Sequence, residues 1–319
     1  MVLRWMGDYG DHNMIIFSGG TGTPKLLNGL RQIMPQEDLT VVVNTAEDVW
    51  VSGNLITPDI DTVLYLFSGR IDEDKWWGIE GDTLRTYEAM RSVGFDEGMM
   101  IGDLDRATHI IRSNMVREGM SLTDATRKIC KLFDIKAHVY PMSDDTVSTM
   151  ITTPDKKMHY QDFWVKEHGE PEVLEVSVDG LSQATISPAV LDAFEKEDKV
   201  LIGPSNPITS IGPIIGLPGM REKLMEKRVV AVSPIIGTEP VSGPAAKLMH
   251  ACGYEVSSTG VAQRYHGLLD AFVHDIRDGP LGNDIGSPDC RIVRADTLMR
   301  SADISKELAR YVYRIFGSL

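Results

Sequence analysis

Short apolar runs and segments with helical periodicity alternate along both ends of the chain. Each run has the length of a strand, and a turn rich in Gly, Ser or Pro separates it from a segment with hydrophobic residues at helical spacing. Strands that alternate with helices form parallel sheets covered on both faces, so this order predicts an α/β fold. The expected strands cover residues 15–17, 39–43, 199–202, 228–232, 272–274 and 291–293, and a closing helix covers 304–315.

The middle of the chain has a different pattern. It predicts successive helices over 82–92, 104–118 and 123–133, followed by short strands between 137 and 178. Ser121 and Asp124 predict a capping box for the third helix. We therefore expect a Rossmann-like parallel sheet with helices on both faces, plus a smaller inserted α+β lobe. The expected parts are an N-terminal extension (1–13), a Rossmann-like nucleotide-binding domain (14–79 and 190–319) and an inserted substrate-binding lobe (80–189).

Composition and charge narrow the possible partners. The 319 residues include 32 Lys and Arg against 46 Asp and Glu, a net charge of −14. Such an acidic surface repels a polyphosphate backbone, so we expect no nucleic-acid partner. The longest apolar runs are too short to span a membrane. Cys130, Cys252 and Cys290 are an odd number without metal-ligand spacing, which is typical of a reduced, cytoplasmic protein.

The turn over residues 18–24 is a candidate phosphate site. Its sequence, SGGTGTP, joins the first strand to a helix, where glycines permit close approach and exposed N–H groups favour an anion. It matches neither the GxGxxG pattern nor a Walker A loop. A tight turn without a ligand is the alternative interpretation.

Two later turns, residues 203–207 and 233–237, also follow predicted strands. The carboxyl ends of parallel strands share one edge of the sheet, so these turns and the glycine turn are expected to line a common nucleotide cleft. Ordinary turn chemistry is the alternative for each of them. The candidate nucleotide- and diphosphate-binding residues are Gly20, Thr21, Gly22, Thr23, Asn44, Ser205, Asn206, Ser233 and Gly237.

Four carboxylates gather after the second strand, at Glu47, Asp48, Asp59 and Asp61. Next to phosphates they would repel the ligand unless they bind a divalent cation, and Mg²⁺ favours oxygen ligands shared with phosphates. We therefore predict Mg²⁺ as the cofactor, with Asp48, Asp59 and Asp61 as candidate ligands. Alternatively, Asp59 caps the following helix and Asp61 stabilises its first turn.

Other candidate residues carry weaker signals. Asp103 and Asp105 follow a predicted turn and could each cap a helix. The eight histidines show no paired metal-ligand spacing. Trp76 and Trp77 offer a stacking surface to an aromatic ligand, although core packing is the commoner use of such a pair.

Taken together, seven segments resemble the 2-phospho-L-lactate transferases of coenzyme F-420 biosynthesis. They include FSGGTGTP at the glycine turn, PDIDT at residues 58–62 and IGDLD at residues 101–105. The full set covers residues 17–30, 42–69, 76–90, 101–109, 141–149, 202–214 and 230–249.

The resemblance implies a Rossmann-like, Mg²⁺-dependent transferase that is usually a homodimer and acts on small molecules. Such an enzyme moves the 2-phospholactyl group of lactyl-2-diphospho-5′-guanosine, or an enolpyruvyl analogue, to the ribityl hydroxyl of the deazaflavin Fo. The products are GMP and the glutamate-free form of coenzyme F-420. Carried onto this chain, the Fo contacts fall at Asp61 and Met100, with Asp103 in the adjoining segment. Asp61, Asp48 and Asp59 are the candidate catalytic acids, and Asp61 is the first choice to orient or deprotonate the hydroxyl.

Two alternatives stay open from the sequence alone. A regulatory nucleotide-sugar-binding protein of the gluconeogenesis-factor group shares the GGTG loop but catalyses no reaction. A nicotinamide-dependent dehydrogenase is disfavoured because GxGxxG is missing and because Asn44 stands where an acid is expected at the end of the second strand.

Overall fold

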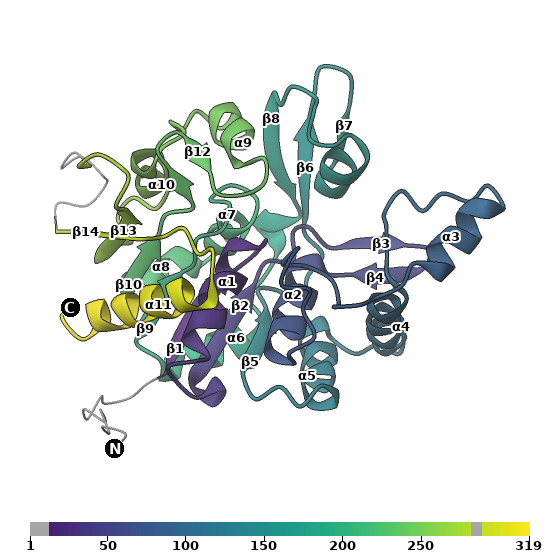
Figure 1. Ribbon diagram of the computed structural model, residues 1–319, viewed down its shortest axis with the longest axis horizontal. Coiled ribbons are helices and arrows are strands. Elements are labelled where there is room, and N and C mark those ends of the chain that lie inside the picture. The colour runs from purple at the N-terminus through teal and green to yellow at the C-terminus, as the bar shows by residue number, and fades with distance from the viewer. Residues whose placement is uncertain (1–12, 282–288) are drawn as a thin grey trace.

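A computed structural model of the chain describes residues 13–281 and 289–319, so the predicted extension over 1–13 lies almost entirely outside the described residues. Seven parallel strands form the central sheet in the order β14-β13-β10-β9-β1-β2-β5 (Figure 1). They are β1 (Met14–Ser18), β2 (Leu39–Val43), β5 (His138–Pro141), β9 (Lys199–Ile202), β10 (Arg228–Val232), β13 (Ala271–Asp275) and β14 (Arg291–Ala295). The chain builds outward from β1 to β5, then returns to β9 on the other side of β1. The strand order therefore reverses between β1 and β9, and such a switch point is where open α/β sheets bind ligands.

The apolar runs of the sequence form the strands because both faces of the sheet are covered. All five residues of β1, of β2 and of β13 are buried. Side chains alternate across β1: Ile15 and Phe17 enter one hydrophobic core, while Met14 and Ile16 enter the other. The sheet is therefore the centre of a three-layer structure, as the sequence predicts.

Helices supply the apolar side chains of the two outer layers. On one face these side chains come from α1 (Gly22–Leu30), α2 (Pro58–Phe67), α5 (Leu122–Leu132) and α11 (Ala302–Phe316). On the other face they come from α6 (Pro188–Lys196), α7 (Ile211–Gly216), α8 (Met220–Met225), α9 (Ala245–Ala251) and α10 (Ser258–Arg264). At the start of α5, Ser121 Oγ accepts a hydrogen bond from Asp124 N at 3.1 Å, which confirms the Ser121 half of the predicted capping box, while the Asp124 carboxylate accepts from Arg127.

Smaller elements extend from the carboxyl edge of the sheet. The hairpin of β3 (Val49–Val51) and β4 (Asn54–Ile56) projects to one side with α3 (Arg85–Ser92) and α4 (Asp103–Arg117), as Figure 1 shows. A three-stranded antiparallel sheet has the order β7-β6-β8, built from β7 (Lys157–His159), β6 (Ser148–Thr152) and β8 (Glu175–Asp179). A second hairpin joins β11 (Ile235–Ile236) to β12 (Glu239–Pro240).

The structure confirms the fold class and adds one feature to the expected division of the chain. β5 lies inside the range 80–189 that the sequence assigns to an inserted lobe, yet it pairs with β2 as the edge strand of the main sheet. That range therefore contributes to the Rossmann-like core, and the domain boundaries themselves stay a prediction. Within residues 13–281 and 289–319, no helix has both the length and the apolar character needed to cross a membrane.

Candidate active site

A cavity of about 550 Å³ opens beside the switch point of the sheet. Its walls come from the segments that follow β1, β2, β9 and β10, together with parts of α2, α4 and the segment before β8. Residues on its polar side include Gly20, Thr21, Gly22, Glu47, Asp59, Asp61, Asp105, His109, Ser205, Asn206, Ser210 and Ser242. Its apolar lining includes Trp77, Met99, Met100, Trp164, Val165 and Val241. We refer to this space below as the cavity.

The glycine turn and the 203–207 turn are joined to each other at the base of the cavity. Thr23 Oγ1 lies 2.6 Å from Ser205 Oγ, which also accepts a hydrogen bond from Thr23 N at 3.2 Å. A Cβ on Gly22 would lie 1.9 Å from the carbonyl oxygen of Pro204, so only glycine permits this approach. Gly20 has φ of 54°, in the left-handed region that favours glycine. Two turns that are 180 residues apart in sequence thus form one surface.

Asp59 connects the glycine turn to the start of α2. Its Oδ1 accepts a hydrogen bond from Gly20 N at 2.7 Å, and its Oδ2 accepts one from Asn44 Nδ2 at 2.9 Å. Burial raises the pKa of Asp59 to about 6, although these two hydrogen bonds favour the ionised form. The Gly20 amide is therefore committed to a carboxylate, and Asp59 is an acid with a pKa close to neutral at the wall of the cavity.

Asp61 belongs to a buried group of charged side chains between α2 and α4. Arg112 donates to both carboxylate oxygens, to Oδ2 at 3.1 Å and to Oδ1 at short range. His109 Nε2 lies 3.2 Å from Asp61 Oδ2. Burial would raise the pKa of Asp61, but Arg112 and His109 outweigh it and lower the pKa to about 2. Asp61 is therefore ionised throughout the physiological pH range.

His109 connects Asp61 to a second acid. Its Nε2 lies 3.1 Å from Asp105 Oδ1, which also accepts a hydrogen bond from the Tyr65 hydroxyl at 2.6 Å. Burial favours the neutral imidazole, yet the contacts with Asp105 and Asp61 raise the pKa of His109 to about 9. The imidazole is thus protonated at neutral pH, and its charge is shared by two carboxylates.

The same group offers ligands to a metal ion. One ligand atom from each of Asp61, Asp105 and His109 lies within 4.8 Å of the others. Asp48 and Asp59, which the sequence analysis names as ligands with Asp61, do not belong to this group. Asp48 is half-buried outside the lining of the cavity, and burial raises its pKa well above the usual range. Of the predicted set, only Asp61 is placed with other metal-ligating side chains.

The predicted nucleotide residues divide into two kinds. Those that line the cavity are Gly20, Thr21, Gly22, Ser205 and Asn206. Thr23, Asn44, Ser233 and Gly237 do not line it and instead hydrogen-bond to neighbouring loops, for example Asn44 to Asp59 and Gly237 N to Asp278. The residues of the second kind support the loops that form the cavity, because their polar atoms bond to those loops and the residues themselves do not line the cavity.

The residues assigned to the Fo contact divide in the same way. Met100 lines the cavity and is half exposed, whereas Asp103 does not line it. Asp103 accepts hydrogen bonds from Thr86 N at 3.0 Å and Arg85 N at 3.1 Å, so it caps α3. The hydroxyl of Thr83, together with the bonds from Thr86, lowers the pKa of Asp103. Helix capping, the alternative that the sequence offered, therefore describes the contacts of Asp103.

Aromatic residues give the apolar side of the cavity its character. Trp77 and Trp164 line it with roughly half of each side chain exposed, and Met100 lies on the same lining. Trp76, the other member of the pair, packs against the hydrophobic core instead. Large flat side chains with exposed faces suit a planar aromatic ligand. Trp76 thus has the core position, and stacking of Trp77 on an aromatic ligand stays a prediction that its place in the cavity permits.

The sequence analysis named Asp105 only as a possible helix cap, and it missed His109 and Arg112 as functional candidates. All are on α4, and Asp105 and His109 stand four residues apart, so both point to the same side of the helix. That i, i+4 spacing was the available signal. The spacing was overlooked because a buried helix face is expected to be apolar, whereas the residues that α4 buries are polar: Arg106, Thr108, His109, Arg112 and Ser113.

Comparisons with known proteins point to one family. The model of the family "2-phospho-L-lactate transferase CofD" matches residues 14–296. A 2-phospho-L-lactate transferase of Methanosarcina mazei is 64% identical over 303 residues, which cover 95% of this chain and 100% of the relative. One from Methanocorpusculum labreanum is 49% identical over 298 residues, covering 92% of this chain and 96% of the relative.

The chain belongs to the 2-phospho-L-lactate transferase CofD family. As a member of the CofD family it is a transferase of F-420 biosynthesis, and the family and activity expected from the sequence are confirmed. The regulatory and dehydrogenase alternatives are not favoured. A solved structure of a UPF0052 family protein from Bacillus halodurans has a TM-score of 0.64 at 16% identity, covers 94% of this chain and 98% of its own, and supports the CofD fold alone.

Proposed function

We propose that this chain transfers the 2-phospholactyl group of lactyl-2-diphospho-5′-guanosine to the ribityl hydroxyl of the deazaflavin Fo. One observation carries the proposal: a single cavity combines a polar wall at Gly20–Gly22 and Ser205–Asn206 with an apolar, Trp-lined wall. The polar wall suits the diphosphate of the donor, and the apolar wall suits a flat ring system. The names of relatives up to 64% identical support the same assignment.

The reaction needs a positioned hydroxyl more than a protein nucleophile. The acceptor oxygen attacks the lactyl-bearing phosphorus, a new P–O bond forms, and the bond to the GMP phosphate breaks with GMP as the leaving group. Catalysis of such a transfer comes mainly from alignment and from stabilisation of the charge on the phosphoryl oxygens. The amides of Thr21 and Gly22, at the start of α1, would supply the alignment on the donor side, since the Gly20 amide is bonded to Asp59.

The acids of the cavity take different parts in handling the hydroxyl proton. Asp61, whose pKa lies near 2, is a weak base and serves to orient the hydroxyl as a hydrogen-bond acceptor. Asp59, whose pKa lies near 6, accepts the proton more readily, because a general base works best with a pKa close to the working pH. We therefore assign orientation to Asp61 and proton acceptance to Asp59.

A divalent ion fits the residues beside Asp61. We propose that Asp61 and Asp105 would hold Mg²⁺ through their carboxylate oxygens, the ligand type this ion prefers, with His109 beside them. Bound there, the ion would neutralise charge on the donor diphosphate. Calorimetric titration of Mg²⁺ tests this set: Asp105→Asn should weaken binding at least tenfold, and Asp48→Asn should change it by less than twofold. If Asp48→Asn weakens Mg²⁺ binding and Asp105→Asn does not, Asp48 is the ligand and the proposed set is wrong.

The activity is tested directly by product analysis. The protein is incubated with Fo, the donor and Mg²⁺, and GMP and the phospholactylated Fo are measured by mass spectrometry. We expect equal amounts of the two products, and a parallel reaction with the enolpyruvyl donor shows which donor is preferred. If neither donor yields GMP, the proposal is wrong.

The homodimer that the resemblance implies stays a prediction, which sedimentation equilibrium tests.

A further inference from the structure

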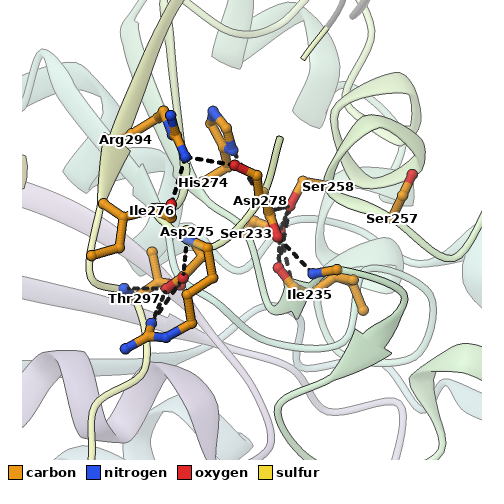
Figure 2. A network of polar contacts seen from close by, with 12 residues as sticks. Ser233, Ile235, Ser257, Ser258, His274, Asp275, Ile276, Asp278, Arg294 and Thr297 are labelled. Atoms are coloured by element: carbon orange, nitrogen blue, oxygen red, sulfur yellow. Dashed lines mark hydrogen bonds and ion pairs between the residues drawn. The ribbon is translucent and has the colours of Figure 1, made fainter. Parts of the chain in front are cut away.

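A buried polar network lies behind the cavity, at the carboxyl ends of β10 and β13. Figure 2 shows Ser233, Ser258 and Asp278 pointing toward one another from three separate segments. Ser258 Oγ donates to Asp278 Oδ2 at 2.7 Å and lies 2.9 Å from Ser233 Oγ. All three side chains are buried, and none of them lines the cavity. The catalytic scheme above leaves this network without a role.

The side chains of the network accept hydrogen bonds from the backbone of the β11–β12 hairpin. Asp278 Oδ1 accepts a hydrogen bond from Gly237 N at 2.6 Å, and Ser233 Oγ accepts one from Ile235 N at 3.1 Å. Both donors are backbone groups of the hairpin, at its first strand and its turn. The hairpin has only two residues in each strand, so these side chains supply much of what fixes its position.

The hairpin in turn carries one wall of the cavity. Val241 N donates to Pro234 O at 3.0 Å, so the residues on either side of the hairpin are bonded to each other. Pro234 and the segment 241–245 line the cavity. Ser242 Oγ lies 3.3 Å from Thr21 Oγ1 in the glycine turn, so this wall stands against the donor side of the cavity.

Asp278 is itself held firmly. Arg294 on β14 donates to the carbonyl oxygen of Asp278 at 2.6 Å and to that of Ile276 (Figure 2). The carboxylate is therefore fixed by the sheet on one side and bonded to the hairpin on the other. A fixed, buried hydrogen-bonding group is well suited to hold a loop in its binding geometry.

We propose that Asp278 is a positioning residue that sets the affinity of the cavity for the guanylated donor by holding the β11–β12 hairpin against the glycine turn. This inference rests on the proposed function. It explains why Ser233 and Gly237 follow the pattern of nucleotide-binding turns without lining the cavity: Gly237 N bonds to Asp278, and Ser233 Oγ contacts Ser258, which donates to Asp278. The acceptor side is lined by Trp77, Met100 and Trp164, which come from segments other than the hairpin.

Kinetics of the Asp278→Asn enzyme test the proposal. Asparagine has the same shape as aspartate, but an NH₂ group replaces one of the two acceptor oxygens. That NH₂ group then faces another donor, either Gly237 N–H or the Ser258 hydroxyl, and one hydrogen bond is lost. We expect the KM for the donor and the Kd for GDP to rise at least fivefold, while kcat and the KM for Fo change by less than twofold. A general loss of structure would move all four quantities together.

Asp275→Asn is the matched control. Asp275 is the last residue of β13, three residues before Asp278, and is also buried, but it accepts hydrogen bonds from Thr297 and Arg277 and none from the hairpin residues. Its donor KM and GDP Kd should stay within twofold of the parent values. The proposal is overturned if Asp278→Asn leaves donor KM and GDP Kd unchanged, or if the two variants raise them alike.

A second variant covers the case in which Asp278→Asn does not fold. Ser258→Ala removes one hydrogen-bond donor to Asp278 and leaves its bond to Gly237 N and its contact with His274. A rise of twofold or more in GDP Kd supports the proposal, and no rise overturns it. Failure of the proposed function is a separate result, since the parent protein would then release no GMP. GDP affinity still measures the role of Asp278 in that event.

Discussion

At the scale of single residues, the site depends on charges that are buried yet compensated. Asp61 is ionised inside the protein because Arg112 and His109 surround it, and His109 is protonated because Asp61 and Asp105 share its charge. Desolvation makes each of these groups costly alone, so the pairing matters more than any single bond. Asp61 lines the cavity, and its role there stays a prediction; the i, i+4 spacing of Asp105 and His109 was the one sequence signal of its partners on α4.

Asp61→Asn tests both roles of this carboxylate. We expect turnover to fall at least tenfold, because the neutral amide neither holds a cation nor orients the hydroxyl as strongly. The free energy of unfolding should fall by about 3–5 kcal/mol, the usual cost of leaving a buried charge without its partner. The double variant Asp61→Asn/Arg112→Met should regain part of that stability but none of the turnover. Near-normal turnover of Asp61→Asn at saturating Mg²⁺ would remove Asp61 from the mechanism.

The raised pKa of His109 predicts a pH dependence of stability in metal-free protein. Because its pKa is about 9 when folded and near 6.5 when unfolded, His109 contributes stability below about pH 6.5 that is lost as the pH rises through about 9. Urea unfolding from pH 6.5 to 9.5 should therefore show a steeper loss for the parent than for His109→Gln. Parallel curves would show that His109 does not bind its proton more tightly in the folded state.

At the scale of elements, hydrophobic pattern identified most of the secondary structure. The predicted strands 199–202 and 228–232 coincide with β9 and β10, because parallel strands buried on both faces are continuous apolar runs. The sequence predicted the helix α4 but not which of its faces is buried. It buries Arg106 and Arg112 and exposes Leu104 and Ile110, so its amphipathic pattern is the reverse of the usual one. Hydrophobic pattern does not identify the buried face of a helix that places charged side chains beside a cavity.

The junction of α1 with the 203–207 turn gives a prediction for one glycine. Gly22→Ala should lower GDP affinity at least tenfold and stability by about 1–3 kcal/mol, because its Cβ would meet the Pro204 carbonyl at 1.9 Å and force the two turns apart. Isothermal titration with GDP and thermal unfolding measure the two effects. Gly317→Ala is the control, since the atom nearest to its Cβ lies at an ordinary 3.6 Å. Equal GDP affinity in both variants would contradict a donor site at this junction.

At the scale of the whole molecule, topology brings the site together. Reversal of the strand order between β1 and β9 places the glycine turn beside the 203–207 turn, and the sequence predicted this shared edge from the strand–turn–helix order alone. The sequence did not show that β5 joins the main sheet, since a four-residue strand carries no mark of its partner. Nor did it separate cavity-lining residues from those such as Asn44 and Ser233 that support them, because both kinds are polar residues at strand ends.

The central claim is that the donor diphosphate binds where the turns after β1 and β9 meet, with the acceptor ring on the Trp-lined side. A crystal structure of the protein with GDP, Mg²⁺ and Fo tests it most directly. We expect the phosphates beside residues 20–22 and 205–206, and the deazaflavin ring against Trp77 or Trp164. Phosphates bound away from both turns, with this cavity empty, would contradict the account.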